Sequence, residues 1–118
     1  MDHGSRRTES NEAFLELVAA FAGKSPYPIV EAAHMECASP TIGEAFDRAV
    51  ARGAEEIVVH PYFLLPGKHW AQDIPALVAE AAKKHSGKTW KVTEPLGASE
   101  KIRDVILERI SAALENRR

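Results

Sequence analysis

The stretch from residue 54 to residue 75 constrains the fold of this chain more than any other segment does. It contains the β-branched run Ile57-Val58-Val59, which is typical of a strand buried on both faces of a parallel sheet. The apolar pattern continues to Leu65 and stops at the turn dipeptide Pro66-Gly67. Ligands of open α/β sheets bind beyond the carboxyl ends of the strands, so the residues after this turn are candidates for a functional site.

Composition limits the chain to one small domain and argues against several classes of protein. A chain of 118 residues has the usual length of a single domain, so we assign residues 1–118 to one domain. The formal net charge is -2, and no basic surface indicates nucleic-acid binding. The single cysteine, Cys37, allows neither an intrachain disulfide nor a CxxC metal site. No apolar run approaches the ~20 residues of a membrane span, and no signal peptide is recognised, which favours a cytoplasmic protein.

Helix-like and strand-like patterns alternate along the chain. Helices are expected from Ser10 to Gly23, from Ser39 to Gly53, from Asp73 to about His85 and over residues 99–115, and strands over residues 29–35, 55–65 and 90–93. This alternation predicts an α/β fold in which helices cover a parallel sheet. A βαβ unit needs a strand before its helix, and Asp2–Arg7 has the character of the loop that follows one. The sequence therefore predicts a sheet that lacks its first strand.

Two histidines and one carboxylate lie in loops at the expected carboxyl edge of the sheet. His3 precedes a Gly-Ser pair, His69 follows the Pro-Gly turn, and Glu36 follows the strand over residues 29–35. Imidazole titrates near neutral pH, so His3 and His69 could bind a divalent metal or accept a proton. Simpler interpretations stay open, because His3 could belong to a flexible terminus, His69 to a solvated loop, and Glu36 to a helix cap.

Other polar and aromatic residues lie close to these three in the sequence. Arg6, Arg7 and Lys68 could bind the carboxylates of an acidic ligand, or they are ordinary surface charges. Ser5 could cap a helix, and Trp70 could pack on a flat ligand ring or in the core. These residues predict a cleft for an anionic ligand with acid/base or metal chemistry.

The remaining histidines carry different expectations. His60 lies inside an apolar strand pattern, so we expect a hydrogen-bonded core side chain. His85 lies near a helix end and is interpreted as a surface residue. His34 ends a strand at the presumed binding edge, and the sequence does not decide its role.

Taken together, the motifs resemble those of the small class II chelatases, most of all the sirohydrochlorin ferrochelatases of plants and cyanobacteria. The matching segments are Asp2-His3-Gly4-Ser5-Arg6-Arg7, His34-Met35-Glu36 with Ser39-Pro40-Thr41-Ile42, residues 61–70 with Gln72-Asp73-Ile74-Pro75, and Pro95-Leu96-Gly97. The resemblance extends over essentially the whole chain. It implies a three-layer, chelatase-like parallel sheet flanked by helices.

The resemblance also implies an activity and a set of site residues. It implies insertion of a divalent metal, iron being favoured, into sirohydrochlorin in sirohaem biosynthesis by a homodimer. The metal is then a substrate, with His3 and His69 as metal ligands and proton acceptors and Glu36 as a weaker candidate for proton relay. The residues implied to bind sirohydrochlorin are Ser5, Arg6, Arg7, Lys68 and Trp70. In a photosynthetic eukaryote the resemblance implies the plastid stroma.

Other functions stay open on the sequence. A relative of this kind could insert cobalt for cobalamin or nickel for another tetrapyrrole, and ligand type does not decide, because affinity rises from iron to cobalt to nickel. A non-catalytic module that binds a tetrapyrrole or a metal is a further alternative. Some plant relatives carry a C-terminal cysteine cluster for an iron–sulfur centre, and with Cys37 alone we predict none here.

Overall fold

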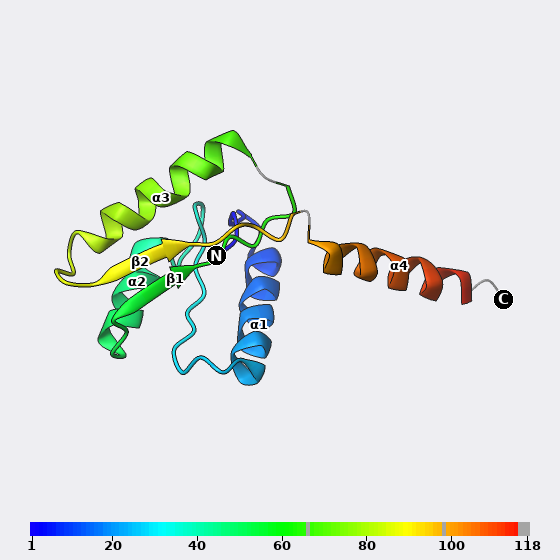
Figure 1. Ribbon diagram of the computed structural model, residues 1–118, viewed down its shortest axis with the longest axis horizontal. Coiled ribbons are helices and arrows are strands. Elements are labelled where there is room, and N and C mark those ends of the chain that lie inside the picture. The colour runs from blue at the N-terminus through cyan, green and yellow to red at the C-terminus, as the bar shows by residue number, and fades with distance from the viewer. Residues whose placement is uncertain (66, 98, 116–118) are drawn as a thin grey trace.

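The computed structural model describes residues 1–65, 67–97 and 99–115, with side chains given for all of these except residues 68–70. The elements in chain order are α1 (Thr8–Lys24), α2 (Ile42–Ala51), β1 (Glu56–Val59), α3 (Lys68–Ala82), β2 (Thr89–Val92) and α4 (Glu100–Glu115) (Figure 1). Strands β1 and β2 pair in parallel, with Glu56 opposite Thr89 and Val59 opposite Val92. The α/β class expected from the sequence is therefore confirmed.

Helices α2 and α3 cover one face of this sheet and enclose the main hydrophobic core. Phe46 of α2 is 2% exposed and Val78 of α3 is fully buried. Because side chains alternate along a strand, only every second residue of β1 and β2 packs against this core. The partly buried strand residues that do so are Ile57, Val59, Trp90 and Val92. Val58 points to the other face and is 56% exposed.

The segment Met1–His3 lies between two other segments of the chain. On one side the Met1 nitrogen donates a hydrogen bond to the carbonyl of His60, and the Tyr62 N–H donates to the carbonyl of Met1, both over 2.7 Å. On the other side, hydrogen bonds of 2.8–3.1 Å join residues 1–3 to residues 33–36. Residues 1–3 therefore act as an interior, strand-like segment next to β1.

The strand expected over residues 29–35 is not formed as such. Only His34 makes strand-like bridges, to Asp2 and to Thr41. A strand needs a neighbour along its length, and residues 1–3 accompany only the end of this segment. The carbonyls of Pro28 and Val30 instead accept hydrogen bonds from the Arg52 guanidinium, at 3.2 and 3.4 Å.

Three expected helix starts are also wrong, and a side-chain cap explains one of them, that of α2. Helix α1 begins before Ser10, with Arg7 as its N-cap residue. Helix α2 begins after Pro40, since Thr41 and Glu44 form a capping box in which each side chain binds the other's backbone N–H. Helix α3 begins at Lys68 rather than near Asp73, so Pro75 lies inside it.

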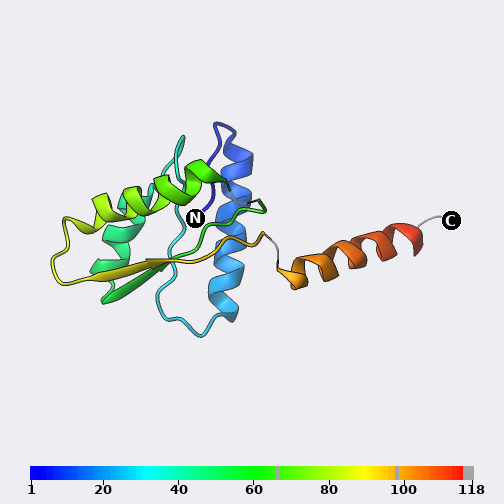
Figure 2. The ribbon, with the colours of Figure 1, turned by 45° about the horizontal axis from the view of Figure 1, so that its top comes forward.

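Helix α4 extends away from the rest of the chain in both views (Figures 1 and 2). It has no buried residue among those that the structure describes, and the molecule measures 59 × 31 × 29 Å. The expected three layers are therefore incomplete in a single chain. None of the described helices combines the length and the apolar character needed to cross a membrane.

Candidate functional site

The loops that were expected to share one edge of the sheet do so where the structure describes them. Asp2 and His3, at the start of the loop over residues 2–7, bind residues 33–36, and the Gly97 N–H donates to the carbonyl of Phe63 over 3.4 Å. The loops after β1 and β2 therefore meet, and His3, beside Glu36, lies against Phe63 in the first of them. Pro66 lies outside the described residues.

His3 and Glu36 form the clearest polar pair at this edge. The His3 Nε2 lies 3.5 Å from Oε1 of Glu36, and their side chains are 45% and 54% exposed. The Glu36 N–H donates to the carbonyl of His3 over 3.1 Å, so the pair is anchored through its backbone. The His3 ring also lies 6.3 Å from the ring of Phe63. An exposed imidazole beside a carboxylate can bind a cation and can pass a proton on to water.

Gly4 allows two segments of the chain to pass close to each other, which brings His3 and Glu36 together. Its φ is +88°, in the left-handed region that favours glycine. A Cβ at this position would lie 1.9 Å from the carbonyl oxygen of Glu36. The Gly after His3 is therefore required by packing against the segment that carries Glu36.

The turn after Gly4 is fixed by hydrogen bonds of Ser5 and Asn11. The Ser5 N–H donates to Oδ1 of Asn11, and the Asn11 side-chain amide donates to the carbonyl of Ser5, at 3.0 and 2.7 Å. The Ser5 hydroxyl accepts from the Arg7 N–H over 3.0 Å, so it helps to form the start of α1. Arg6 and Arg7 are both exposed at this turn.

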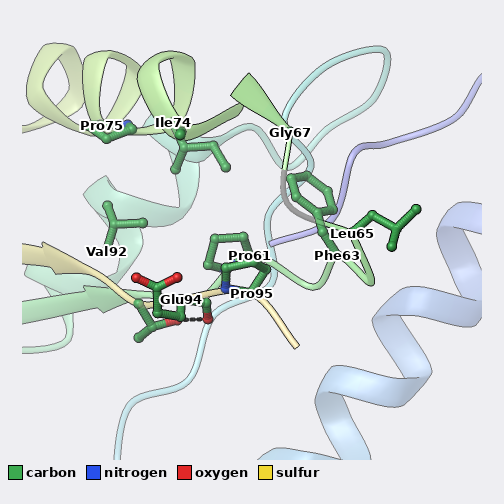
Figure 3. A pocket seen from close by; sticks show the side chains of 11 residues that line it. Pro61, Phe63, Leu65, Gly67, Ile74, Pro75, Val92, Glu94 and Pro95 are labelled. Carbon is green, nitrogen blue, oxygen red and sulfur yellow. Dashed lines mark hydrogen bonds between the residues drawn. The ribbon is translucent and has the colours of Figure 1, made fainter. Parts of the chain in front are cut away.

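A pocket of about 240 Å³ lies between α3 and the carboxyl ends of β1 and β2 (Figure 3). Most of its lining is apolar, and the Glu94 carboxylate extends into the space below Ile74. Phe63 lines this pocket, and its ring also lies near the His3 ring. Phe63 therefore connects the pocket to the His3–Glu36 pair. The lining residues include Pro61, Phe63, Ile74, Val92, Glu94 and Pro95.

Sequence reasoning selected none of these lining residues as a site residue, including Glu94 and Phe63. Glu94 follows β2 at the same edge at which Glu36 follows its own segment, so the rule that selected Glu36 also applies to Glu94. Phe63 lies within an apolar run, and no sequence signal distinguishes it from an ordinary core residue.

The second candidate histidine lies in a helix rather than in a loop. His69, with Lys68 and Trp70, belongs to the first turn of α3. The side chains of these three residues lie outside the described part of the chain, so their expected roles stay predictions. Among the side chains that are described, no group of three or more His, Cys, Asp and Glu residues could hold a metal ion.

The other histidines lie in distinct environments. His60 is half-buried, its Nδ1 lies 2.7 Å from the Thr93 hydroxyl, and burial lowers its pKa below the usual value. His85 is less exposed than expected, because its Nε2 lies 2.7 Å from Oδ1 of Asp47 and its ring stacks on Phe46. His34 is completely buried.

Comparison with known proteins shows what this chain is similar to. A family model described as CbiX matches residues 1–113. Chloroplastic sirohydrochlorin ferrochelatase from Arabidopsis thaliana is 50% identical over 116 residues, covering 98% of this chain and 52% of that protein. A sirohydrochlorin cobaltochelatase from Methanocaldococcus jannaschii is 32% identical over 131 residues, covering 91% of this chain and 92% of that protein.

A solved structure has a fold similar to that of this chain. SirB from Bacillus subtilis with Fe³⁺ matches with a TM-score of 0.89 at 25% identity, covering 95% of this chain and 44% of that one. The chain thus spans about half the length of the Arabidopsis and Bacillus proteins and nearly all of the Methanocaldococcus protein.

The close approach at Gly4 leads to a prediction about stability. Gly4→Ala should lower the free energy of unfolding by at least about 1–3 kcal/mol, because it adds left-handed backbone strain to the overlap with the Glu36 carbonyl. Gly53→Ala is the matched control for the overlap, since Gly53 also has a positive φ, of +104°, but an added Cβ meets nothing within 4 Å there. Urea denaturation measures both variants. Equal stability of Gly4→Ala and the wild-type chain would contradict the described packing.

Proposed function

This chain belongs to the CbiX family of class II chelatases, and from that premise we propose that it inserts a divalent metal ion into sirohydrochlorin. The observation that carries the proposal is the His3–Glu36 pair at the open edge of the sheet, in a chain half identical to a sirohydrochlorin ferrochelatase. Iron is the favoured metal, because identity to the cobaltochelatase is lower, at 32%. Cobalt and nickel remain the alternative metal substrates.

Metal insertion makes two chemical demands that this edge can meet. Two pyrrole N–H protons must leave the macrocycle while its nitrogens bind the cation. His3 can ligate the incoming cation or accept one of these protons, and Glu36, 3.5 Å away, can take that proton on to solvent. Both side chains are about half exposed, which gives the cation and the protons access to water. We assign His69 the matching role on the side of α3.

The surroundings of this pair suit a flat, polyanionic substrate. The pocket beside Phe63 is mostly apolar, which suits the face or an edge of the macrocycle. The Glu94 carboxylate in that pocket would repel the carboxylates of sirohydrochlorin. We therefore place the substrate carboxylates near Arg6, Arg7 and Lys68, with Ser5 holding the turn that carries the two arginines. Trp70 is assigned to the ring of the substrate.

The compartment and the cofactors follow the same proposal. We assign the chain to the cytoplasm, or to the plastid stroma in a photosynthetic eukaryote, as for the chloroplastic relative. We assign it no iron–sulfur cluster, since Cys37 is its single cysteine.

Absorbance-monitored insertion of Fe²⁺, Co²⁺ and Ni²⁺ into sirohydrochlorin tests the activity. We expect turnover above the uncatalysed rate, fastest with iron. His3→Ala and His69→Ala should each lower kcat/KM by at least about 100-fold, the usual size of a lost acid/base or ligand group, and Glu36→Gln should lower it by less. These variants should melt as cooperatively as the wild-type chain.

His85→Ala is the control for these substitutions, because His85 binds Asp47 at the far end of α3. Its turnover should match that of the wild-type chain. Full activity of His3→Ala or of His69→Ala would contradict the assigned roles. A chain that binds sirohydrochlorin and melts cooperatively but inserts no metal would instead be a tetrapyrrole-binding module.

We also propose a homodimer in which α4 packs on a second copy. The apolar side chains of α4 have little cover within one chain, and those that are at least 40% exposed are Val105, Ile106, Leu107, Ile110 and Leu114. Parallel sheets are normally covered on both faces, yet Val58 of β1 remains 56% exposed. A helix from a second copy would cover such a face and bury both apolar surfaces.

Charged residues on α4 should prevent this association. The double variant Ile106→Asp, Ile110→Asp should sediment as a monomer at concentrations where the wild-type chain sediments as a dimer, because two carboxylates would be buried in the interface. Glu108→Lys changes a charge on the face of the helix opposite Ile106 and Ile110 and should leave the dimer intact. A wild-type monomer, or a double variant that still dimerises, would exclude the proposed interface.

A further inference from the structure

His34 is the one polar side chain that the described part of the chain buries completely. Its Nδ1 lies 2.6 Å from Oδ1 of Asp2, whose side chain is 22% exposed. A carboxylate only accepts hydrogen bonds, so Nδ1 of His34 carries a hydrogen and donates a hydrogen bond to Asp2. The His34 Nε2 is buried with no hydrogen-bond partner among the described residues. Burial of such a nitrogen opposes folding, which points to a role other than packing.

The side chains of residues 1–3 alternate between two sides of the sheet. Met1 packs against the core under α2 and α3. Asp2 turns to His34, whose ring lies 5.7 Å from the ring of Phe14 on α1. His3 turns back toward Phe63, a residue of the α2 and α3 core. This period of two is that of extended backbone.

A slip of one residue in this segment would exchange the two sides. Asp2 would then take the place of His3 at the open edge, and His3 would turn toward α1. Backbone hydrogen bonds alone do not prevent such a slip, because each residue offers the same N–H and C=O groups. The Asp2–His34 hydrogen bond does, since it exists only in the observed register. Fixing register is the best-attested use of buried polar groups.

We propose that Asp2 and His34 are positioning residues that fix the register of residues 1–3 and thereby hold His3 opposite Glu36. Two backbone hydrogen bonds next to the pair transmit the effect, from Met35 N–H to Asp2 and from Glu36 N–H to His3. Neither residue of the pair acts on the substrate itself. The effect on turnover rests on the proposed metal insertion, whereas the effect on register does not.

His34→Phe tests the effect on turnover. Phe keeps a ring beside Phe14 and removes the hydrogen bond to Asp2. We expect kcat for metal insertion to fall about 10- to 100-fold, because only the molecules that keep the observed register hold His3 opposite Glu36. The KM for sirohydrochlorin should change by less than about threefold. Asp2→Ala should lower kcat to the same extent. The double variant Asp2→Ala, His34→Phe should lose no more activity than either single variant, because all three remove the same hydrogen bond.

Asp2→Asn provides the conservative rescue. Its amide oxygen still accepts a hydrogen bond from Nδ1 of His34, so it should retain most of the activity that Asp2→Ala loses. If His34→Phe does not fold, the comparison of Asp2→Asn with Asp2→Ala still tests the positioning role. Equal kcat for Asp2→Ala and the wild-type chain, or equal loss in Asp2→Asn and Asp2→Ala, would overturn the positioning role.

The register can be measured by NMR without turnover. The rings of His3 and Phe63 lie 6.3 Å apart, so Overhauser contacts between them are expected in the wild-type chain and should weaken in His34→Phe. The stacked rings of Phe46 and His85, 5.5 Å apart, are the internal control and should not change. Undiminished contacts between His3 and Phe63 in His34→Phe would overturn the proposal. Loss of these contacts in a chain that inserts no metal would refute the activity alone.

His85→Phe is the matched control for turnover. It removes a histidine–aspartate hydrogen bond of the same kind, 2.7 Å from Nε2 to Oδ1 of Asp47, away from the site. Its kcat should stay within about twofold of the wild-type value. A purely structural role for Asp2 and His34 predicts that Asp2→Ala and His34→Phe lower the melting temperature and leave kcat unchanged. That result would overturn the proposal.

Discussion

The candidate site depends on the hydrogen bonds that hold residues 1–3 between two other segments. Partners on both sides leave this short segment little freedom, so the directions of its side chains are set by the alternation of extended backbone. That alternation sends His3 to the open edge, 3.5 Å from Glu36. The same close passage leaves no space for a side chain at Gly4. His3 and Glu36 are therefore positioned by backbone pairing rather than by a rigid helix.

The sequence was sufficient for the fold class but not for all of its elements. Apolar periodicity is a local property, and it correctly predicts helices and two parallel strands in alternation. A strand also needs a neighbour, which is a non-local property, so the strand expected over residues 29–35 is reduced to bridges at His34. Helix starts depend on caps such as Thr41, and Pro75, a residue favoured at helix starts, lies inside α3.

The candidate site was predictable to the extent that one rule covers it. Polar residues that follow strands gather at the carboxyl edge, and this rule found His3 and Glu36. The partnership of Asp2 with His34 joins positions 32 residues apart and has no local signature. The role of His69 stays a prediction. For a chelatase, the useful result is a polar pair open to water beside an apolar pocket, since metal ions and protons must move while a flat ring is held.

Amide hydrogen exchange tests the central claim, that residues 1–3 are held as an interior segment, most directly. The N–H groups of Met35, Glu36 and Tyr62 donate to the carbonyls of residues 1–3. The account predicts that they exchange as slowly as the Thr93 N–H, which donates to Val59 at the end of the strand pair. Exchange as fast as that of the Tyr27 N–H, in an exposed turn, would show that the segment is not held and would contradict the account.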